Sequence, residues 1–439
     1  MIGQIIFFVL LGTASFLFAR RIGVIRRNIL SGQPWDGTTR KSERWSTMAR
    51  VALGQGKMTK RPVAGVMHLL IYAGFIIINI EILEILFDGL FGTHRAFAGI
   101  GIVYDVLIGA FEWLALGVIV ACVVFFIRRN GLALARLVSK DLKGWPSLDA
   151  NIILVIEILL MFAFLSMNAA DSIAQQRALD HYVDAGSFPI SSWLVPLYAG
   201  LSDGGIILLE RSMWWFHIIG VLAFLVYVTY SKHFHIILAF PNTYYSNLNP
   251  PGQMDNMASV KKEVDLMMDP SADPYAAAPE TEAPPARFGV KDATDLTWKQ
   301  LLESYTCTEC GRCTSECPAN LTGKLLSPRK IMMSTRDRIE EIGKQREANK
   351  GQWESDGKFL LGDYISEEEL WACTSCQACI EACPINISPM GIILDMRRSL
   401  IMEDSKSPES ITTMFNNIEN NGAPWAFPAG TRGDWTNES

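Results

Sequence analysis

One cysteine pattern occurs twice in the second half of this chain, and it constrains the fold more than any other feature. Each copy reads Cys-x2-Cys-x2-Cys-x3-Cys-Pro. The first copy contains Cys307, Cys310, Cys313 and Cys317, and the second contains Cys373, Cys376, Cys379 and Cys383. Cys122 is the one remaining cysteine. Thiols repeated so densely at one spacing indicate that this part of the chain folds around metal centres.

The spacing is typical of bacterial ferredoxins that hold two [4Fe–4S] clusters. One tight loop can supply three thiolates to a cluster, and the fourth must come from elsewhere. In two-cluster ferredoxins, the cysteine before the proline binds the cluster of the other copy. We therefore predict that one cluster is bound by Cys307, Cys310, Cys313 and Cys383. The other cluster would be bound by Cys373, Cys376, Cys379 and Cys317.

Two other uses of these cysteines are weaker alternatives. A zinc ion is satisfied by two Cys-x2-Cys pairs and does not require the longer pattern twice. Disulfides are typical of secreted chains, whereas the loop charges described below predict that this segment is cytoplasmic. The iron–sulfur interpretation is therefore favoured.

The first 240 residues carry most of the apolar side chains of a sequence that is 49% hydrophobic with a mean hydropathy of +0.19. Five apolar runs approach the ~20 residues that a helix needs to cross a bilayer. They are roughly Ile2–Ala19, Val63–Phe87, Gly101–Ile127, Asn151–Ala169 and Trp214–Tyr230. The first run is not expected to be a cleaved signal peptide, because its basic residues follow the apolar stretch. The net charge of −6 differs from the positive charge expected of a protein that binds nucleic acid.

Loop charges predict how these spans are oriented. Residues 20–62 carry eleven lysines and arginines and residues 128–150 carry five, whereas residues 88–100 carry one and residues 170–213 carry two. By the positive-inside rule, the N-terminus lies outside and the chain after about residue 231 is cytoplasmic. We therefore expect a multi-pass protein of the bacterial inner membrane whose iron–sulfur domain faces the cytoplasm.

Two histidines near the predicted cytoplasmic surface suggest a haem site. His68 lies near that end of the second span, and His235 lies at a similar depth just beyond the fifth. Two such histidines can bind a b-type haem through both axial positions. An ionisable side chain in a span costs enough free energy to suggest that it has a function. The alternative is a histidine bonded to a backbone carbonyl. The eighteen residues between His217 and His235 make five helical turns, so both face one way about 27 Å apart. His233, two residues before His235, is expected to point roughly away from it.

A second haem would require a partner for His217 near the outer surface. The second span has no histidine at that depth, so His94 in the following loop is the best candidate and His181 a poorer one.

Among the carboxylates inside spans, Glu112 and Glu157 are the deepest. They would either pass protons to a quinone or pair within the bundle.

Together these residues resemble a known family. The span with His68, the run Trp214-Trp-Phe-His217 and the run Ser231-Lys-His-Phe-His235 resemble the haem b subunits of respiratory nitrate reductase (gamma) and heterodisulfide reductase (E). The cysteine region resembles the C-type subunit of heterodisulfide reductase. The combination is similar to membrane iron–sulfur oxidoreductases, including electron-transfer-flavoprotein:menaquinone oxidoreductases. The nitrate reductase family has two histidines on its second span, whereas this chain has one there.

The resemblance implies an all-α protein, in which a five-helix transmembrane haem b bundle precedes a cytoplasmic α-helical ferredoxin domain. We expect the haem b domain at 1–240, a linker rich in proline and acidic residues at 241–295, the dicluster domain at 296–405, and a partner-docking tail at 406–439. Capping boxes at Thr297–Gln300 and Ser366–Glu369, together with Ser327-Pro328, predict helix starts in the dicluster domain.

These features predict a subunit of a membrane-bound, quinone-linked oxidoreductase. It would relay electrons between a cytoplasmic donor and menaquinone. The sequence has no dinucleotide fingerprint, so the expected donor is an electron-transferring flavoprotein or a dehydrogenase. Related fused oxidoreductases continue into a cysteine-rich CCG domain, so a heterodisulfide-reductase-B-like CCG subunit is an expected partner. The alternatives are the membrane subunit of a heterodisulfide-reductase-like thiol/disulfide system and a redox-sensing anchor.

Overall fold

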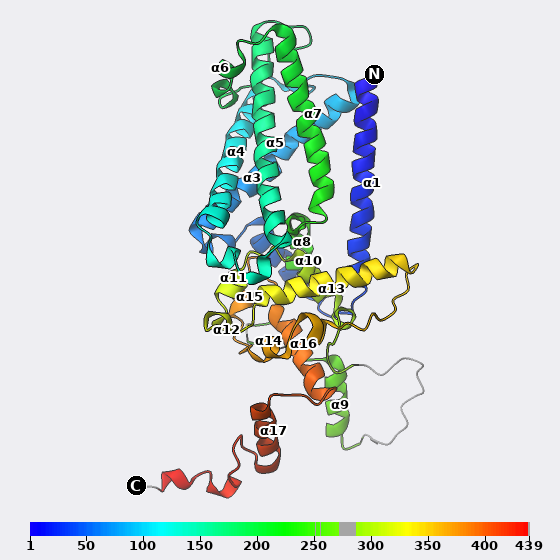
Figure 1. Cartoon of the computed structure of the whole chain (residues 1–439), viewed down its shortest axis with the longest axis vertical. Coiled ribbons are helices and arrows are strands. Elements are labelled where there is room, and N and C mark those ends of the chain that lie inside the picture. Colours follow the sequence, from blue (N-terminus) through cyan, green and yellow to red (C-terminus); the bar gives the residue numbers. More distant parts are fainter. Residues whose placement is uncertain (251, 255, 272–286, 438–439) are drawn as a thin grey trace.

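Helices and loops, without a β-strand, make up the residues that the structure describes, which are 1–250, 252–254, 256–271 and 287–437. In this computed structural model, five long helices stand together as a bundle (Figure 1). They are α1 (Ile2–Leu30), α3 (Pro62–Phe91), α4 (Ile102–Phe126), α5 (Trp145–Gln176) and α7 (Asp203–Val228). All five are long and apolar enough to cross a membrane. The prediction of a mostly helical chain with five such segments is therefore confirmed.

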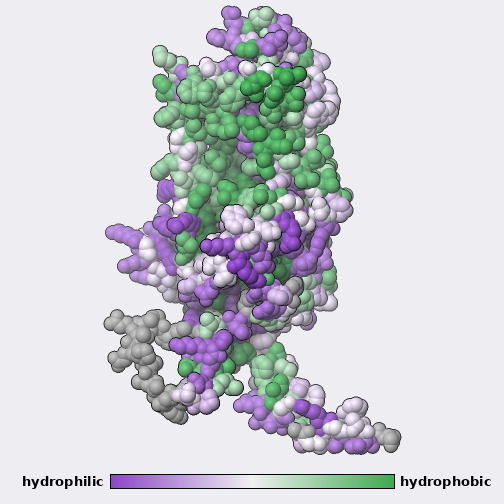
Figure 2. All heavy atoms as spheres, turned by 180° about the vertical axis from the view of Figure 1, so that it is seen from behind, coloured by the Kyte–Doolittle hydropathy of each residue, from purple (hydrophilic) through white to green (hydrophobic). Residues whose placement is uncertain are grey.

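The bundle is apolar on its outside as well as in its core. Helix α5 packs against α4 and α7, while α3 packs against α4, and α1 packs against α3 and α7. Phe7 and Phe164 are fully buried between these helices, but Phe8, Val106 and Leu208 are largely exposed. Figure 2 shows apolar side chains gathered over the bundle and polar ones below it. A helix that is hydrophobic on all sides is expected in a membrane rather than in water.

The fifth apolar helix does not continue to His235, as the spacing of His217 and His235 assumed. Helix α7 stops at Val228, and the Ser231 hydroxyl accepts a 3.1 Å hydrogen bond from the His233 backbone N–H. This cap begins a short 3-10 turn, after which α8 (His235–Tyr244) starts as a separate helix. His217 and His235 are therefore not five turns apart on one helix. The spacing of 3.6 residues per turn does not apply between these two residues, because a side-chain cap interrupts the backbone hydrogen bonds of the helix.

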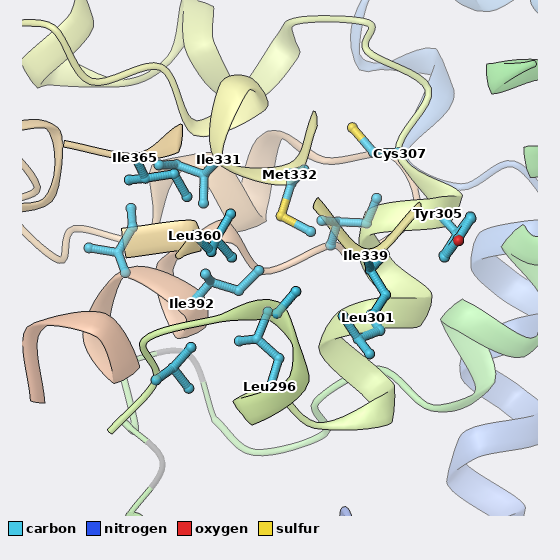
Figure 3. Close-up of a cluster of buried hydrophobic side chains, with 14 of the residues drawn as sticks. Leu296, Leu301, Tyr305, Cys307, Ile331, Met332, Ile339, Leu360, Ile365 and Ile392 are labelled. Carbon is cyan, nitrogen blue, oxygen red and sulfur yellow. The ribbon is translucent and has the colours of Figure 1, made fainter. Parts of the chain in front are cut away.

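The C-terminal half forms a compact helical domain. Its main helices are α10 (Trp298–Thr306), α13 (Pro328–Ala348) and α16 (Pro389–Met402). Leu301, Ile331, Ile339, Leu360 and Ile392 are fully buried at its centre (Figure 3). The three predicted helix starts are confirmed, since side chains of Thr297, Ser327 and Ser366 cap α10, α13 and α14 (Glu367–Trp371).

This domain is packed onto one end of the bundle, called the near end here; the opposite end is the far end. A single hydrophobic core joins the two halves, because Ile25, Ile29 and Leu238 belong to the same cluster as Leu301 and Ile339. Polar contacts add to it: the Asn28 amide donates to the Tyr305 hydroxyl at 2.9 Å. The contact is close, since a Cβ at Gly343 would lie 2.4 Å from the Asn28 Oδ1. The domain is therefore held by packing and not only by its linker.

The predicted linker and tail contain some structure of their own. Helix α9 (Ala258–Met268) lies within the predicted linker, whose centre at 272–286 is outside the described residues. Residues from 287 onward already join the domain, as the Val290 N–H donates to the Asp395 carbonyl at 3.0 Å. In the tail, α17 (Glu409–Asn421) projects away from the domain (Figure 1) and leaves Phe415 and Ile418 exposed. Partner docking by this tail stays a prediction.

We expect Arg329→Ala to destabilise the protein by about 3 kcal/mol, because it leaves a carboxylate without its buried partner. The Arg329 side chain is fully buried, and its guanidinium donates to both oxygens of Asp141 at 2.7 and 3.0 Å. Asp141 lies in the loop between α4 and α5, so the pair also connects the domain to the bundle. The melting temperature of the purified protein measures the effect. As a control, Arg20→Ala removes an ion pair to Glu347 that is mostly exposed and should cost at most about 1 kcal/mol.

Candidate functional site

The first cysteine loop and the last cysteine of the second copy meet around one hollow. Its lining includes Cys307, Cys310, Cys313 and Cys383, and also Cys379 of the second copy. Helices α11 (Arg312–Ser315) and α15 (Ala378–Ala382), which follow the two loops, pack against each other. The structure therefore brings together the four cysteines predicted for the first cluster. We call this group the first site.

The two cysteine loops share an unusual backbone conformation. Glu309 and Gly311 have positive φ angles of 55° and 70°, and Ser375 and Gln377, at the equivalent positions of the second copy, have 56° and 62°. Alternating turns of this kind aim several backbone N–H groups at one point and form an anion-binding concavity. Glycine suits position 311, because a Cβ there would come within 2.8 Å of the Arg136 backbone carbonyl oxygen. Both loops are thus shaped to surround a negatively charged group.

Backbone N–H groups do reach the sulfurs. The Ile387 N–H donates to Cys383 Sγ at 3.3 Å, and the Ser375 N–H donates to Cys373 Sγ at 3.4 Å. Burial raises the pKa of Cys307 to about 12 and that of Cys383 to about 11. Thiols with such pKa values stay protonated at neutral pH unless a metal centre displaces the protons. Buried sulfurs that receive N–H donors fit thiolate ligands of an iron–sulfur cluster.

The remaining cysteines form a second, more exposed group. Burial raises the pKa of Cys379 to about 12, and the neighbouring Cys373, Cys317 and Cys376 contribute in the same direction. These four, predicted to hold the second cluster, are therefore close together; we call them the second site. Cys376 is exposed, whereas Cys317 is buried. Within the described residues, no three histidines, cysteines or acids converge tightly enough for one metal ion; a four-iron cluster holds its ligands farther apart.

The predicted haem ligands lie close together at the near end of the bundle. The rings of His68 and His235 have centroids 6.5 Å apart, which fits two imidazoles on opposite sides of one metal with bonds of about 2 Å each. His235 Nδ1 is 3.0 Å from the Lys232 carbonyl, so its other nitrogen can bind a metal. His68 Nδ1 is buried without a hydrogen-bond partner. These features fit an axial haem ligand pair.

A third histidine, which was predicted to point away from His235, joins this pair. The ring centroid of His233 is 5.6 Å from that of His235, and His233 also contacts Phe224. Burial lowers the pKa of His233 to about 3, so this imidazole is neutral at physiological pH. The expected opposite orientation does not occur, because the two residues lie across the junction of a 3-10 turn and α8 rather than within one helix.

Comparison with known proteins agrees with the cysteine geometry. Residues 306–387 match the family of 4Fe-4S dicluster domains. The chain is 27% identical to a probable iron-sulfur-binding oxidoreductase, FadF, of Bacillus subtilis, over 99% of this chain and 61% of that protein. It is 25% identical to an EtfAB:quinone oxidoreductase of Syntrophomonas wolfei, over 88% of this chain and 53% of that protein.

A shorter relative matches the cysteine region. The C-type subunit of a ferredoxin/F(420)H(2)-dependent CoB-CoM heterodisulfide reductase from Methanosarcina acetivorans is 33% identical over 25% of this chain and 53% of that protein. No solved structure matches the chain. The chain spans between about half and three-fifths of the length of its two long relatives. The similarity to iron–sulfur oxidoreductases and the presence of a 4Fe-4S domain are therefore established, whereas the haem b fusion stays a prediction.

The two histidines predicted for a second haem are not in contact within the described part of the chain. His217 is buried in the middle of α7, and its Nδ1 is 2.9 Å from the Leu160 carbonyl of α5. His94 lies at the far end, where its ring contacts Tyr182 and its Nε2 is 3.7 Å from Asp171. Binding of one haem by both residues stays a prediction.

His94 belongs to a polar pocket at the far end that sequence reasoning did not assemble. Its lining includes Glu81, Glu84, Arg95, Asp171, Glu210, Arg211 and Trp214. Most of these groups are paired: Arg95 with Asp171, Arg211 with Glu210, and Glu84 with the Phe97 N–H at 2.8 Å. Glu81 differs, since its Oε2 is buried and has no hydrogen-bond partner. The sequence shows that Glu81 and Glu84 lie in the second span, but which of them is paired depends on the fold.

The two predicted proton-handling carboxylates have different surroundings. Glu112 is fully buried and accepts hydrogen bonds from Asn168 at 3.1 Å and from the Ile190 and Ser191 N–H groups at 2.8 and 3.0 Å. It therefore anchors the loop before α6 (Val195–Tyr198) to the bundle. Glu157 is half-buried and lies near Cys122, with no hydrogen bond to any described residue. A proton-handling role stays a prediction for both.

Proposed function

We propose that this chain is the electron-transfer subunit of a membrane-bound, quinone-linked oxidoreductase. One observation carries the proposal: the second site, the first site and the His68–His235 pair follow one another from the exposed edge of the domain into the bundle. Cys376 is exposed, and Cys379 also lines the first site. Arg312 of the first-site loop lies near enough to His68 to affect it electrostatically. Such an order suits passage of electrons between a soluble partner and the membrane.

The proposed cofactors are two [4Fe–4S] clusters, held by the first and second sites, and a haem b held by His68 and His235. When bound, these groups take up and release single electrons. The chain contributes ligands, orientation and exclusion of water. Loop N–H groups stabilise the thiolates, and the Lys232 carbonyl fixes the ring orientation of His235. Burial of Cys307 and Cys383 keeps solvent from the first site.

We place menaquinone, the proposed membrane substrate, at the far end, with His217 nearby. A second haem between His94 and His217 is a further hypothesis. The pocket there offers Glu81 as a carboxyl group with an unpartnered oxygen, and reduction of a quinone consumes two electrons and two protons. Glu81 is thus our first candidate for proton transfer, with Glu157 as the next. The tryptophan and histidine in the same pocket provide a surface for an aromatic head group.

The partners are proposed from chemistry and from the relatives. The exposed second site is the expected entry point for electrons from an electron-transferring flavoprotein or a dehydrogenase, and the match to an EtfAB:quinone oxidoreductase supports this choice. A CCG subunit of the heterodisulfide-reductase-B type is the other expected partner. The match to the C-type heterodisulfide reductase subunit favours a second function, in which electrons reach a thiol/disulfide substrate on such a partner.

The proposed location is the bacterial inner membrane, with the iron–sulfur domain in the cytoplasm. The near end carries the lysine- and arginine-rich loops, as the positive-inside rule requires. A reporter enzyme that works only in the cytoplasm should be active when it is fused after Ser439, and one that works only in the periplasm should be inactive. Activity of a periplasmic-type reporter at this position would reverse the proposed orientation.

The route to quinone is tested in the dithionite-reduced protein. After addition of a menaquinone analogue, stopped-flow absorbance should show rapid haem oxidation in the parent. Glu81→Gln should slow it by about a hundredfold, because general acid catalysis typically contributes that much, while leaving reduction by dithionite unchanged. Glu157→Gln serves as the comparison. If only Glu157→Gln slows the reaction, the proton path is not through the far pocket; undiminished quinone reduction in His68→Ala would exclude the haem route.

A further inference from the structure

Three cations surround the first site, and two of them come from loops of the bundle. Arg136, between α4 and α5, donates to the Cys310 carbonyl. Lys57, before α3, donates to Asn386 Oδ1 at 3.0 Å and to the Ile380 carbonyl at 3.3 Å. Arg312 lies within the first cysteine loop itself. All three line or adjoin the space around Cys307, Cys310 and Cys383.

The positive charge of these cations is largely uncompensated. Arg312 donates to the Lys57 carbonyl at 3.2 Å and to the Met58 sulfur at 2.9 Å, both neutral acceptors. Neither Arg136 nor Arg312 has a carboxylate within ion-pair distance among the described residues. The Lys57 Nζ lies 4.0 Å from a carboxylate oxygen of Glu381, but Lys60 lies closer to that carboxylate and pairs with it.

Other charges near the first site cancel one another. Glu309, buried in the first loop, pairs with Lys232 and with Arg336, and these two cations also contact Asp149 and Asp337. Arg329, which lines the hollow, pairs with Asp141. What remains next to the first-site thiols is therefore a surplus of positive charge from Lys57, Arg136 and Arg312.

The second site has a smaller positive surplus. Arg397 donates to the Leu370 and Cys373 carbonyls and acts electrostatically on Cys373. Cys376 is exposed, so water screens charge at this site more strongly than at the buried first site. The two sites thus use the same loop conformation but differ in electrostatic surroundings.

We propose that Lys57, Arg136 and Arg312 hold the first site at a higher reduction potential than the second. Reduction adds one electron, and hence one negative charge, to the group that four thiolates already make anionic. Nearby cations in a low-dielectric interior stabilise the added charge. The asymmetry favours residence of an electron at the site adjoining the bundle. Because Lys57 and Arg136 belong to the bundle loops, this bias depends on the domain being docked. The inference rests on the two clusters of the proposed function.

The test is a redox titration of the purified full-length protein, poised with dithionite and mediators and followed by electron paramagnetic resonance. The first-site signal is identified as the one that Cys313→Ser removes. In Arg312→Gln and Arg136→Gln, the equilibrium constant for reducing the first site should fall about tenfold, which is a 59 mV lower potential for one electron. The second-site potential should not change. Arg312→Lys, which keeps the charge, should restore most of the loss.

Two controls separate this effect from general damage. Arg397→Gln should lower only the second-site potential, and Lys140→Gln, an exposed cation in the same loop as Arg136, should change neither. Equal shifts at both sites, or no shift in Arg312→Gln and Arg136→Gln with full iron content, would overturn the inference. A parent protein that binds no iron would refute the proposed clusters and this inference together, whereas two clusters of equal potential would refute the inference alone.

Discussion

Replacing Cys383 with serine is expected to remove about four of about eight irons, and to remove them from the first site although Cys383 belongs to the second cysteine copy. The reason is geometric: Cys383 lines the same hollow as Cys307, Cys310 and Cys313. Cys317→Ser should remove the other half, because Cys317 lies with Cys373 and Cys379. Iron and acid-labile sulfide content, measured after anaerobic purification, give the extent of each loss.

The identity of the lost cluster decides between crossed and uncrossed ligation. The paramagnetic signal that disappears in Cys383→Ser should be the one that disappears in Cys313→Ser. Cys122→Ser should retain both signals, since Cys122 is buried between apolar helices of the bundle and packs as a small hydrophobic residue. Loss of the same signal in Cys383→Ser and Cys376→Ser would show instead that each copy binds its own cluster.

Substituting alanine for either His68 or His235 should abolish the low-spin b-type spectrum of the haem at the near end. Axial ligation by two histidines needs both nitrogens, and the 6.5 Å ring separation suits one metal between them. His181→Ala is the matched control, because His181 is exposed in a loop at the far end. The absorbance difference between reduced and oxidised protein reports the haem, and iron–sulfur content should remain unchanged.

His233 makes this experiment discriminating. It lies 5.6 Å from His235 and is buried and neutral, so it is the alternative ligand that the structure offers. We expect His233→Ala to keep the low-spin spectrum, since His235 is the histidine whose ring contacts His68. A low-spin haem that survives His235→Ala but is lost in His233→Ala would assign the ligand to His233. Survival in both variants and in His68→Ala would remove the haem from this end of the bundle.

Patterns local in sequence predicted much of this fold. The five apolar helices follow from the length and composition of single segments, and the helix starts at Thr297, Ser327 and Ser366 follow from side chains that bond within one turn. The cysteine spacing likewise predicted a 4Fe-4S domain, which the family comparison supports. In each case the pattern lies within one short segment of the chain, and only the fourth cysteine of each cluster has to come from the other copy.

Local patterns were less informative where a helix could end in several places. The apolar run predicted an end near Tyr230, close to the observed end at Val228, but it did not predict the 3-10 turn between this helix and His235. The Ser231 side chain caps that turn and so affects the orientation of His233, and nothing in the sequence distinguishes this serine from serines that cap nothing. Glu112 also illustrates the limit. Its depth in a span suggested either proton transfer or pairing within the bundle. Its observed partners are Asn168 of α5 and the backbone at 190 and 191, in a loop almost 80 residues away.

Contacts between distant segments were decided only by the tertiary structure. The common core of Ile25 with Ile339, the pairing of Arg329 with Asp141, and the approach of Lys57 and Arg136 to the first cysteine site each join residues more than 150 positions apart. Their formation depends on how whole helices pack, because burial of apolar surface is non-directional and does not specify which partners meet. The sequence therefore predicts which cofactors the chain can bind, and the packing of the domain on the bundle determines which charges surround them.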